Sequence, residues 1–310
     1  MKYLVAAAVL PALALLLYIR KLDKVEAEPT GMIMKLCGFG ALTVISAVIL
    51  EVLGGAILGA FLPEDSLLYI ALENYLIVAG AEEAGKLFAL KKGTWKSPQF
   101  NYTYDAVVYA VAASLGFAAV ENVMYVLDGG FGLAVLRALT SLPGHAIFGV
   151  FMGLFYGAAK KDEMRRNESG KRFHMAAALL VPMLLHGFYD FCLSVSSGWM
   201  LLLFFVFFII LMIISFFLVR KLAQKDEPVV QLFAQPANPA VSPANFRTAP
   251  VNPAQPVYPQ TPPANPAQPV YPQTPPVNPA AQPVYPQTPP VNPTAQPVYP
   301  QTPPNNYPMQ

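Results

Sequence analysis

The sequence has 310 residues, of which 55% are hydrophobic and only 12% are charged, against roughly 25% charged residues in a typical soluble domain. This composition excludes an ordinary soluble globular protein. The net charge of +2 is not gathered into a basic patch with interleaved aromatic residues, so no nucleic-acid partner is expected. With only two cysteines, both inside apolar runs, a disulfide framework or a CxxC metal site is also excluded.

Long apolar runs predict transmembrane helices, because about 20 residues at about 1.5 Å each cross a hydrocarbon core about 30 Å thick. The first run is followed by Arg20 and Lys21 without a small-residue cleavage site, so we expect an uncleaved anchor. The predicted fold is all-α, a polytopic helical membrane protein surrounded by the lipid bilayer. Its seven helices are expected near residues 3–19, 32–61, 67–90, 106–127, 131–159, 173–195 and 199–219.

Basic residues alternate between the connections. They follow the first, third, fifth and seventh runs, whereas the connections after the second, fourth and sixth runs contain no lysine or arginine. Because basic loops stay in the cytoplasm, this pattern predicts a multi-pass protein of the cell membrane with its N-terminus outside and its C-terminus in the cytoplasm.

The composition changes abruptly near residue 226, and 26 of the 32 prolines follow that point, in units such as NPAQPVYPQTPP. Proline removes backbone donors and disfavours helix and sheet. We therefore expect a transmembrane helical domain over residues 1–225 and a disordered, cytoplasmic proline-rich tail over 226–310. The tail is either a ligand for a cytoplasmic partner with an aromatic groove or a spacer without a partner.

Ionisable residues inside the apolar runs are the informative positions, since each is costly in a membrane unless it is paired or faces a wet cavity. In the third run Glu82 and Lys86 lie one turn apart and Glu83 is adjacent. A simple ion pair would lock helix packing. Two carboxylates with one lysine leave an excess negative charge, which favours a general base.

Three later runs carry further buried polar groups. Glu121 and Asn122 lie in the fourth run, His145 in the fifth, and His186 and Asp190 one turn apart in the sixth. A lone buried histidine is more often a packing residue than a functional one. Carboxylates at three places (Glu82-Glu83, Glu121 and Asp190), with two imidazoles and one lysine on four helices, however, exceed what packing alone requires.

These residues belong to longer motifs that resemble the PrsW family of intramembrane proteases. The resemblance covers about residues 8–195 and leaves out the proline-rich tail. It rests on Glu82-Glu83-x-x-Lys86, Asp105 to Tyr109, Gly116 to Tyr125, Pro143-Gly144-His145, His186 to Phe191, and the stretch from Asp23 to Pro29.

The resemblance implies an intramembrane endopeptidase that cuts membrane-anchored proteins, with an anti-sigma factor as the family's substrate. It assigns catalytic roles to Glu82, Glu83, Glu121, His145, His186 and Asp190, supported by Lys86 and Asn122. More distantly, the family is similar to the CAAX prenyl endopeptidases and bacteriocin-processing enzymes. Those relatives carry a histidine where this chain has Glu121, so their zinc site does not carry over directly.

Two chemistries stay open. In a glutamate peptidase without a metal, which we slightly favour, Glu82 activates a water, Glu83 assists, and a histidine stabilises the oxyanion or protonates the leaving amine. In a zinc peptidase, His145, His186 and a carboxylate, Glu121 in the set we name, bind Zn²⁺ and a glutamate acts as the base.

Counting residues from the helix ends puts Glu82, His145 and His186 near mid-membrane. The same count puts Glu121 more than about 10 Å from Glu82 in straight helices. Either a helix is kinked or broken near Gly80 and Gly85, or Glu121 lies on the substrate-access side. The alternative function is an ion- or proton-coupled transporter, for which buried glutamate, histidine and lysine residues are equally typical.

Overall fold

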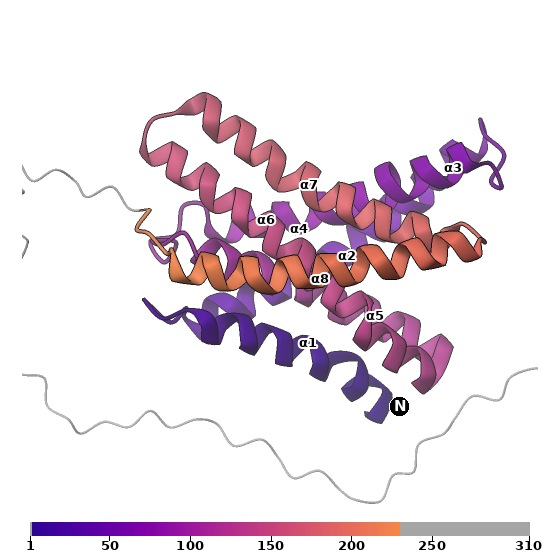
Figure 1. The fold of residues 1–310 in the computed structure, drawn as a ribbon, viewed down its shortest axis with the longest axis horizontal. Coiled ribbons are helices and arrows are strands. Elements are labelled where there is room, and N and C mark those ends of the chain that lie inside the picture. Colours follow the sequence, from indigo (N-terminus) through magenta and orange to yellow (C-terminus); the bar gives the residue numbers. More distant parts are fainter. Residues whose placement is uncertain (1, 230–310) are drawn as a thin grey trace, which may run out of the picture. The chain divides into compact units, whose positions relative to one another are not determined.

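The structure, a computed structural model, describes residues 2–229, and this part of the chain is helical with no named strand. The all-α prediction is confirmed. In chain order the elements are α1 (Lys2–Leu22), α2 (Thr30–Gly59), α3 (Leu67–Leu72), the π-helix η1 (Glu73–Val78), α4 (Ala79–Thr94), α5 (Asp105–Leu139), α6 (Ser141–Met164), α7 (Glu168–Ser194) and α8 (Gly198–Gln224) (Figure 1).

Five helical stretches within residues 2–229 are long and apolar enough to cross a membrane, and the longest, Asp105–Met164, comprises both α5 and α6. The predicted third helix, residues 67–90, is not among these five. It is helical from Leu67 to Thr94 as α3, η1 and α4, but its glutamates and lysines make it more polar than the other runs. α4 instead contacts α2, α5 and α7, and its charged residues Glu82, Glu83 and Lys86 are buried inside the bundle.

Helix α5 forms the centre of the bundle and contacts α1, α2, α4 and α6. Every residue from Asp105 to Ala118 is buried. Its contact with α2 is close because small residues face each other: a Cβ atom on Gly116 would lie 2.1 Å from the backbone oxygen of Cys37. Small residues of this kind let helix backbones approach in membrane proteins, where packing replaces the hydrophobic effect.

The end of α5 differs from the prediction. The expected break at residues 128–130 is present as a kink, because Gly130 has φ 72°, a conformation that glycine adopts without a steric penalty. After this kink the chain stays helical to Leu139, so α6 begins at Ser141 and not at residue 131. The segment 131–139 thus forms a short return toward the bundle before α6.

The basic connections lie at one end of the bundle. In Figure 1 the α1–α2 and α6–α7 connections and the end of α8 share the left-hand end, opposite the N-terminus. Beyond α8, Asp226 to Val229 still contact this end: the amides of Thr103 and Val229 donate to the backbone oxygens of Glu227 and Asn101, at 2.9 and 2.7 Å. The rest of the predicted tail, residues 230–310, lies outside the described residues.

Candidate active site

The two glutamates and the lysine of α4 form a buried charge cluster. The Nζ atom of Lys86 lies 2.9 Å from Oε2 of Glu82 and 2.8 Å from Oε1 of Glu83. The i, i+3 and i, i+4 spacing of one helix is sufficient to bring the three together. One cation thus neutralises two carboxylates only in part, as the sequence predicts. The second oxygen of Glu83, Oε2, is buried without a hydrogen-bond partner.

His145 of α6 connects this cluster to Glu121 of α5. Its Nδ1 atom lies 3.0 Å from Nζ of Lys86, and its Nε2 atom lies 2.8 Å from Oε2 of Glu121. An ammonium group only donates hydrogen bonds, so Nδ1 is the acceptor and Nε2 carries the proton that it donates to Glu121. Glu121 therefore lies within the network, and the alternative that set it apart on the substrate-access side is wrong. The π-helical geometry of η1, just before Glu82, departs from the straight helix that the count assumed, and the continuation of α5 beyond residue 127 was not predicted from the sequence.

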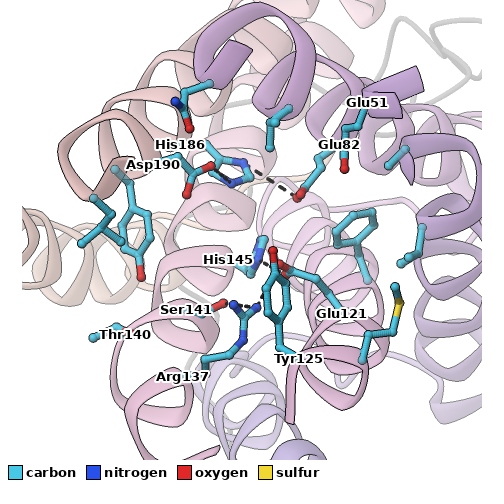
Figure 2. Close-up of a pocket in the computed structure, with 18 of the residues that line it drawn as sticks. Glu51, Glu82, Glu121, Tyr125, Arg137, Thr140, Ser141, His145, His186 and Asp190 are labelled. Carbon is cyan, nitrogen blue, oxygen red and sulfur yellow. Dashed lines mark hydrogen bonds and ion pairs between the residues drawn. The ribbon is translucent and has the colours of Figure 1, made fainter. Parts of the chain in front are cut away.

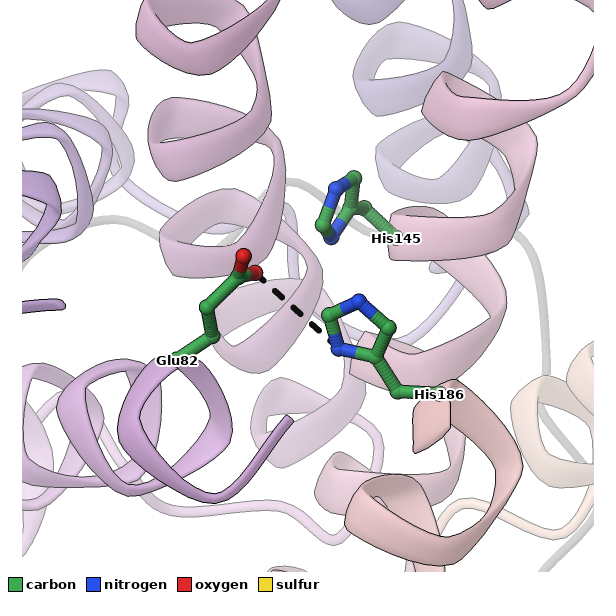
Figure 3. Close-up of side chains that lie close together, drawn as sticks. All are labelled: Glu82, His145 and His186. Atoms are coloured by element: carbon green, nitrogen blue, oxygen red, sulfur yellow. Dashed lines mark ion pairs between the residues drawn. The ribbon is translucent and has the colours of Figure 1, made fainter. Parts of the chain in front are cut away.

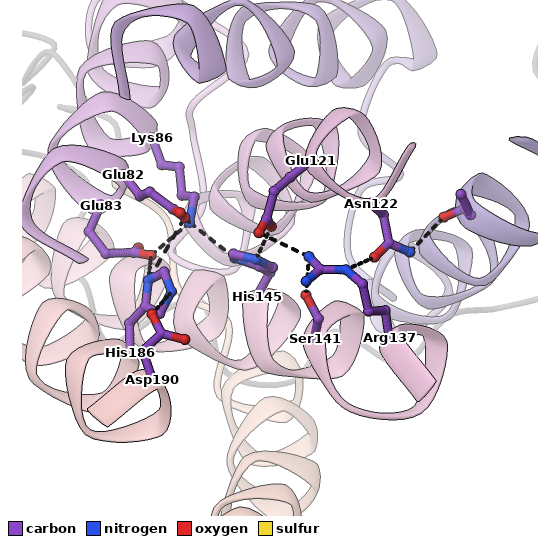
Figure 4. Close-up of polar contacts among 11 residues, drawn as sticks. Glu82, Glu83, Lys86, Glu121, Asn122, Arg137, Ser141, His145, His186 and Asp190 are labelled. Atoms are coloured by element: carbon purple, nitrogen blue, oxygen red, sulfur yellow. Dashed lines mark hydrogen bonds and ion pairs between the residues drawn. The ribbon is translucent and has the colours of Figure 1, made fainter. Parts of the chain in front are cut away.

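His186 and Asp190 of α7 complete the group. The Nδ1 atom of His186 lies 2.9 Å from Oε1 of Glu83, and its Nε2 atom lies 3.0 Å from Oδ2 of Asp190. Both ring nitrogens face carboxylates, an arrangement that an imidazolium satisfies fully. Figure 4 shows the resulting network of polar contacts, which extends from Asp190 through His186, Glu83, Lys86 and His145 to Glu121.

Arg137 extends this network and was missed by the sequence analysis. It comes from the return segment after the Gly130 kink, and its NH2 atom lies 2.9 Å from Oε1 of Glu121. It also donates to Asn122 Oδ1 at 2.5 Å and to the hydroxyl of Ser141 at 3.0 Å. Asn122 therefore contacts Arg137 and the backbone of Ala8, not the histidines. The sequence did contain a signal for this residue, because Arg137 is the only arginine in the apolar run 131–159.

The network borders a cavity of about 650 Å³ between α2, η1, α4, α5, α6 and α7 (Figure 2). Glu82 lines this cavity, whereas Glu83, which has no exposed surface, does not. Glu51 of α2 also lines it and was likewise missed, although a carboxylate within the apolar run 32–61 was a visible signal. The remaining polar groups in the wall are Asn74, Glu121, Tyr125, Asp128, Arg137, Thr140, Ser141, His145, His186, Tyr189, Asp190 and Ser194.

Three side chains of the site are suited to bind a metal ion by their type and their position: Glu82, His145 and His186. Each offers one ligand atom, and the three atoms lie within 4.8 Å of one another (Figure 3). Two imidazoles and one carboxylate match the three protein ligands of many catalytic zinc sites. The structure groups Glu82 with the two histidines, where the sequence analysis named Glu121. Glu121 contacts the other ring nitrogen of His145 and so orients that ring.

Comparison with known proteins identifies the family. A family model described as PrsW family intramembrane metalloprotease matches residues 28–218, more than half of the chain. This chain belongs to the PrsW family. The expected resemblance and the intramembrane peptidase activity are thereby confirmed, and the transporter alternative is not favoured.

Curated proteins named Protease PrsW are similar over most of their length. One from Geobacillus kaustophilus (strain HTA426) is 34% identical over 196 residues, which is 63% of this chain and 82% of the relative. Another from Bacillus subtilis (strain 168) is 30% identical over 204 residues, 64% of this chain and 85% of the relative. No solved structure is a significant match. The family membership places the chain in the membrane, while the roles of individual site residues stay predictions.

Proposed function

We propose that this PrsW-family peptidase hydrolyses its substrate in the cavity beside Glu82, with a Zn²⁺ ion held by Glu82, His145 and His186. The observation that carries the proposal is the convergence of these three ligand atoms within 4.8 Å. The description of the family as metalloproteases agrees with it. A bound zinc ion acts as a Lewis acid and lowers the pKa of a water molecule to about 7.

The surroundings of the two histidines support this ligand set. Metal-binding histidines donate their second ring N–H to a carboxylate or carbonyl, which fixes the ring and its tautomer. Here Glu121 contacts Nε2 of His145 and Asp190 contacts Nε2 of His186, so both Nδ1 atoms face the interior of the group. The Nδ1 atom of His186 also lies 3.9 Å from Oε2 of Glu82.

Lys86 competes with a metal ion for two of the proposed ligand atoms, Nδ1 of His145 and Oε2 of Glu82. Its ammonium group is 3.0 Å from Nδ1 of His145 and 2.9 Å from Oε2 of Glu82, so it occupies the position that a cation between them would share. Metal binding therefore requires Lys86 to turn toward Glu83. Lys86 then keeps one buried carboxylate neutralised, since its Nζ atom is already 2.8 Å from Oε1 of Glu83.

Hydrolysis also needs a group that accepts a proton from the attacking water, and we assign this role to Glu51. Of the other cavity-lining carboxylates, Glu82, Glu121 and Asp190 are committed to ion pairs, and Asp128 is exposed. Glu51 is half-buried in the same cavity and forms no hydrogen bond or ion pair with any residue in 2–229. An unpaired carboxylate is free to take up a proton and pass it to the leaving amine.

The metal-free alternative assigns the roles differently. There Glu82 accepts the proton from water, and Lys86 with His186 stabilises the charge that develops on the peptide oxygen. Its support is the set of contacts among these residues as they stand. The two mechanisms differ in what chelation does and in which glutamate is indispensable.

For the substrate we propose a single-span membrane-anchored protein, and, from the family resemblance, an anti-sigma factor. We also propose that the N-terminus faces outward and the C-terminus the cytoplasm, because the basic connections share one end of the bundle. The proline-rich residues 230–310 are outside the described structure. A cytoplasmic partner for them remains part of the proposal and is not required for cleavage.

The test uses the full chain reconstituted in lipid vesicles with a single-span substrate, and measures both cleavage and bound zinc. Chelation is expected to abolish cleavage, and added Zn²⁺ to restore it. Glu82→Gln and His186→Ala should lose zinc and activity together, whereas Glu51→Gln should keep zinc and lose activity by roughly 100-fold or more. Glu64→Gln, an exposed glutamate in the α2–α3 connection, is the matched control.

Cleavage that is unaffected by chelation, with Glu82→Gln inactive, would reject the zinc site in favour of the glutamate mechanism. Normal cleavage by Glu82→Gln, Glu83→Gln and His186→Ala alike would remove this cavity as the place of catalysis.

A further inference from the structure

A second group of buried carboxylates lies well away from the active site. Asp23 and Glu28 come from the connection between α1 and α2, and Asp105 is the first residue of α5. Each offers one oxygen, and the three oxygens lie within 4.8 Å of one another. Asp105 and Glu28 are 1% exposed and Asp23 is 8% exposed. Asp105 precedes Glu121 by 16 residues of one helix, or about 24 Å.

Two oxygens of this group are left without partners. Oδ1 of Asp105 and Oδ2 of Asp23 are both buried and accept no hydrogen bond from any described residue. The other oxygen of Asp105 accepts from the amides of Asn101 and Tyr102, at 2.9 and 2.7 Å. Glu28 accepts from the hydroxyl of Tyr109. One oxygen of each side chain is thus held by a hydrogen bond, and Asp105 and Asp23 each keep a second buried oxygen without a partner.

The negative charge of the group is not balanced by protein. Within residues 2–229, no lysine, arginine or histidine forms an ion pair with Asp23, Glu28 or Asp105. Arg20 donates to the backbone oxygen of Glu28 and not to its carboxylate. Three buried carboxylates at this separation need a cation or shared protons, since isolated buried charges are costly.

We propose that Asp23, Glu28 and Asp105 bind a hard divalent cation, Mg²⁺ or Ca²⁺. Both ions prefer carboxylate and carbonyl oxygens, and Ca²⁺ at about 2.3–2.6 Å from each ligand places opposite oxygens about 5 Å apart, comparable with the spread seen here. Nitrogen and sulfur ligands are missing from the three-residue set, which disfavours Zn²⁺. The buried amide oxygen of Asn101, also without a partner, is an additional oxygen close by in the chain.

The bound ion would connect elements that are far apart in sequence. Asp23 and Glu28 flank the turn that follows α1, whereas Asp105 starts the central helix α5. A cation between them fixes the α1–α2 connection to the start of α5. Binding of an ion to the folded state alone raises thermal stability in proportion to the logarithm of its concentration.

The test uses the full chain, purified in lipid nanodiscs and treated with chelator, and titrates Mg²⁺, Ca²⁺ and Zn²⁺ separately while the unfolding temperature is measured. Mg²⁺ or Ca²⁺ should raise this temperature progressively. Asp23→Asn and Glu28→Gln should weaken the response at least about tenfold in ion concentration. Glu64→Gln, an exposed acid in the α2–α3 connection, should leave the response unchanged. Glu82→Gln should leave it unchanged as well, which separates this site from the active site.

Terbium luminescence measures ion binding directly and can also be used for variants that fold poorly. Tb³⁺ replaces Ca²⁺ at oxygen sites, and Tyr109, which contacts Glu28, is placed to sensitise its luminescence. Wild type should give Tyr-sensitised emission that Ca²⁺ or Mg²⁺ displaces and that Asp105→Asn lacks. If neither ion changes the unfolding temperature of wild type while lower pH raises it, the carboxyls share protons and the proposal is overturned. A response that Glu82→Gln abolishes would overturn it as well.

Discussion

The Nζ atom of Lys86 lies 3.0 Å from the Nδ1 atom of His145, so a lysine of α4 determines which nitrogen of an α6 histidine carries the proton. Because Lys86 donates, His145 presents its N–H to Glu121 on α5. Glu121 in turn pairs with Arg137. One ammonium group therefore sets the hydrogen-bond direction across three helices, and each link in this series can be tested separately.

Replacing Lys86 with methionine should destabilise the protein strongly. The change leaves Glu82 and Glu83 as uncompensated buried carboxylates, and breaking a buried ion pair typically costs about 3–5 kcal/mol. Lys86→Met combined with Glu83→Gln should recover a large part of this loss, because one of the two charges is then removed as well. Thermal unfolding of the detergent-solubilised chain measures both variants.

The control for this pair is Lys92→Met, which removes an exposed lysine from the same helix and should change little. If Lys86→Met is as stable as Lys92→Met, the ion pairs of Lys86 do not stabilise the fold. Bound zinc, measured in the same samples, should not decrease in Lys86→Met, since the competing ammonium group is gone.

Arg137→Ala should lower the cleavage rate by roughly 10- to 100-fold, because Glu121 loses its second partner and no longer holds the His145 ring in place. Arg137→Lys should restore only part of the rate, since an ammonium group cannot reproduce the planar fork that reaches Glu121, Asn122 and Ser141 together. Steady-state cleavage of a single-span substrate provides the measurement, with Arg172→Ala as the control.

Gly116→Ala should destabilise the contact between α2 and α5. The added Cβ would lie 2.1 Å from the backbone oxygen of Cys37, so the helices must separate, at an expected cost of about 1–3 kcal/mol or more. Gly38→Ala is a matched control on α2, where no atom lies within 4 Å of the new Cβ. Equal unfolding temperatures for the two variants would contradict the close approach of these helices.

Much of this architecture follows from local sequence. Apolar runs and basic connections predicted the helices and the shared end of the loops, and the i, i+4 spacing predicted the pairing of Glu82 with Lys86. The contact of Glu121 with His145 was not predicted, because Gly130 kinks the chain between these two residues. The depth of Glu82 was also misjudged, because η1 just before it is π-helical and not a regular α-helix. Such features change the positions of side chains without changing the hydropathy pattern. Arg137 and Glu51 were overlooked because each stands alone in an apolar run.

The boundary of the proline-rich tail gives the last prediction. Asp226 and Glu227 were assigned to the tail on composition, yet Oδ1 of Asp226 accepts from the amide of Tyr104 at 2.7 Å and from the hydroxyl of Thr103 at 2.9 Å. Tyr104 immediately precedes α5. A chain that ends after Lys225 should therefore unfold at a lower temperature than one that ends after Val229, because hydrogen bonds to a charged group contribute on the order of 1.5–3 kcal/mol.

The chain ending after Val229 should cleave its substrate as well as the full-length protein, since all of the described site residues precede that point. Asp226→Ala in the 229-residue chain should reproduce most of the destabilisation of the shorter truncation, and Lys225→Ala should not. Equal stability of the two truncations would mean that the contacts of Asp226 to Val229 with residues 101–104 contribute nothing. Loss of cleavage after deletion of residues 230–310 alone would instead make the proline-rich segment part of the functional protein.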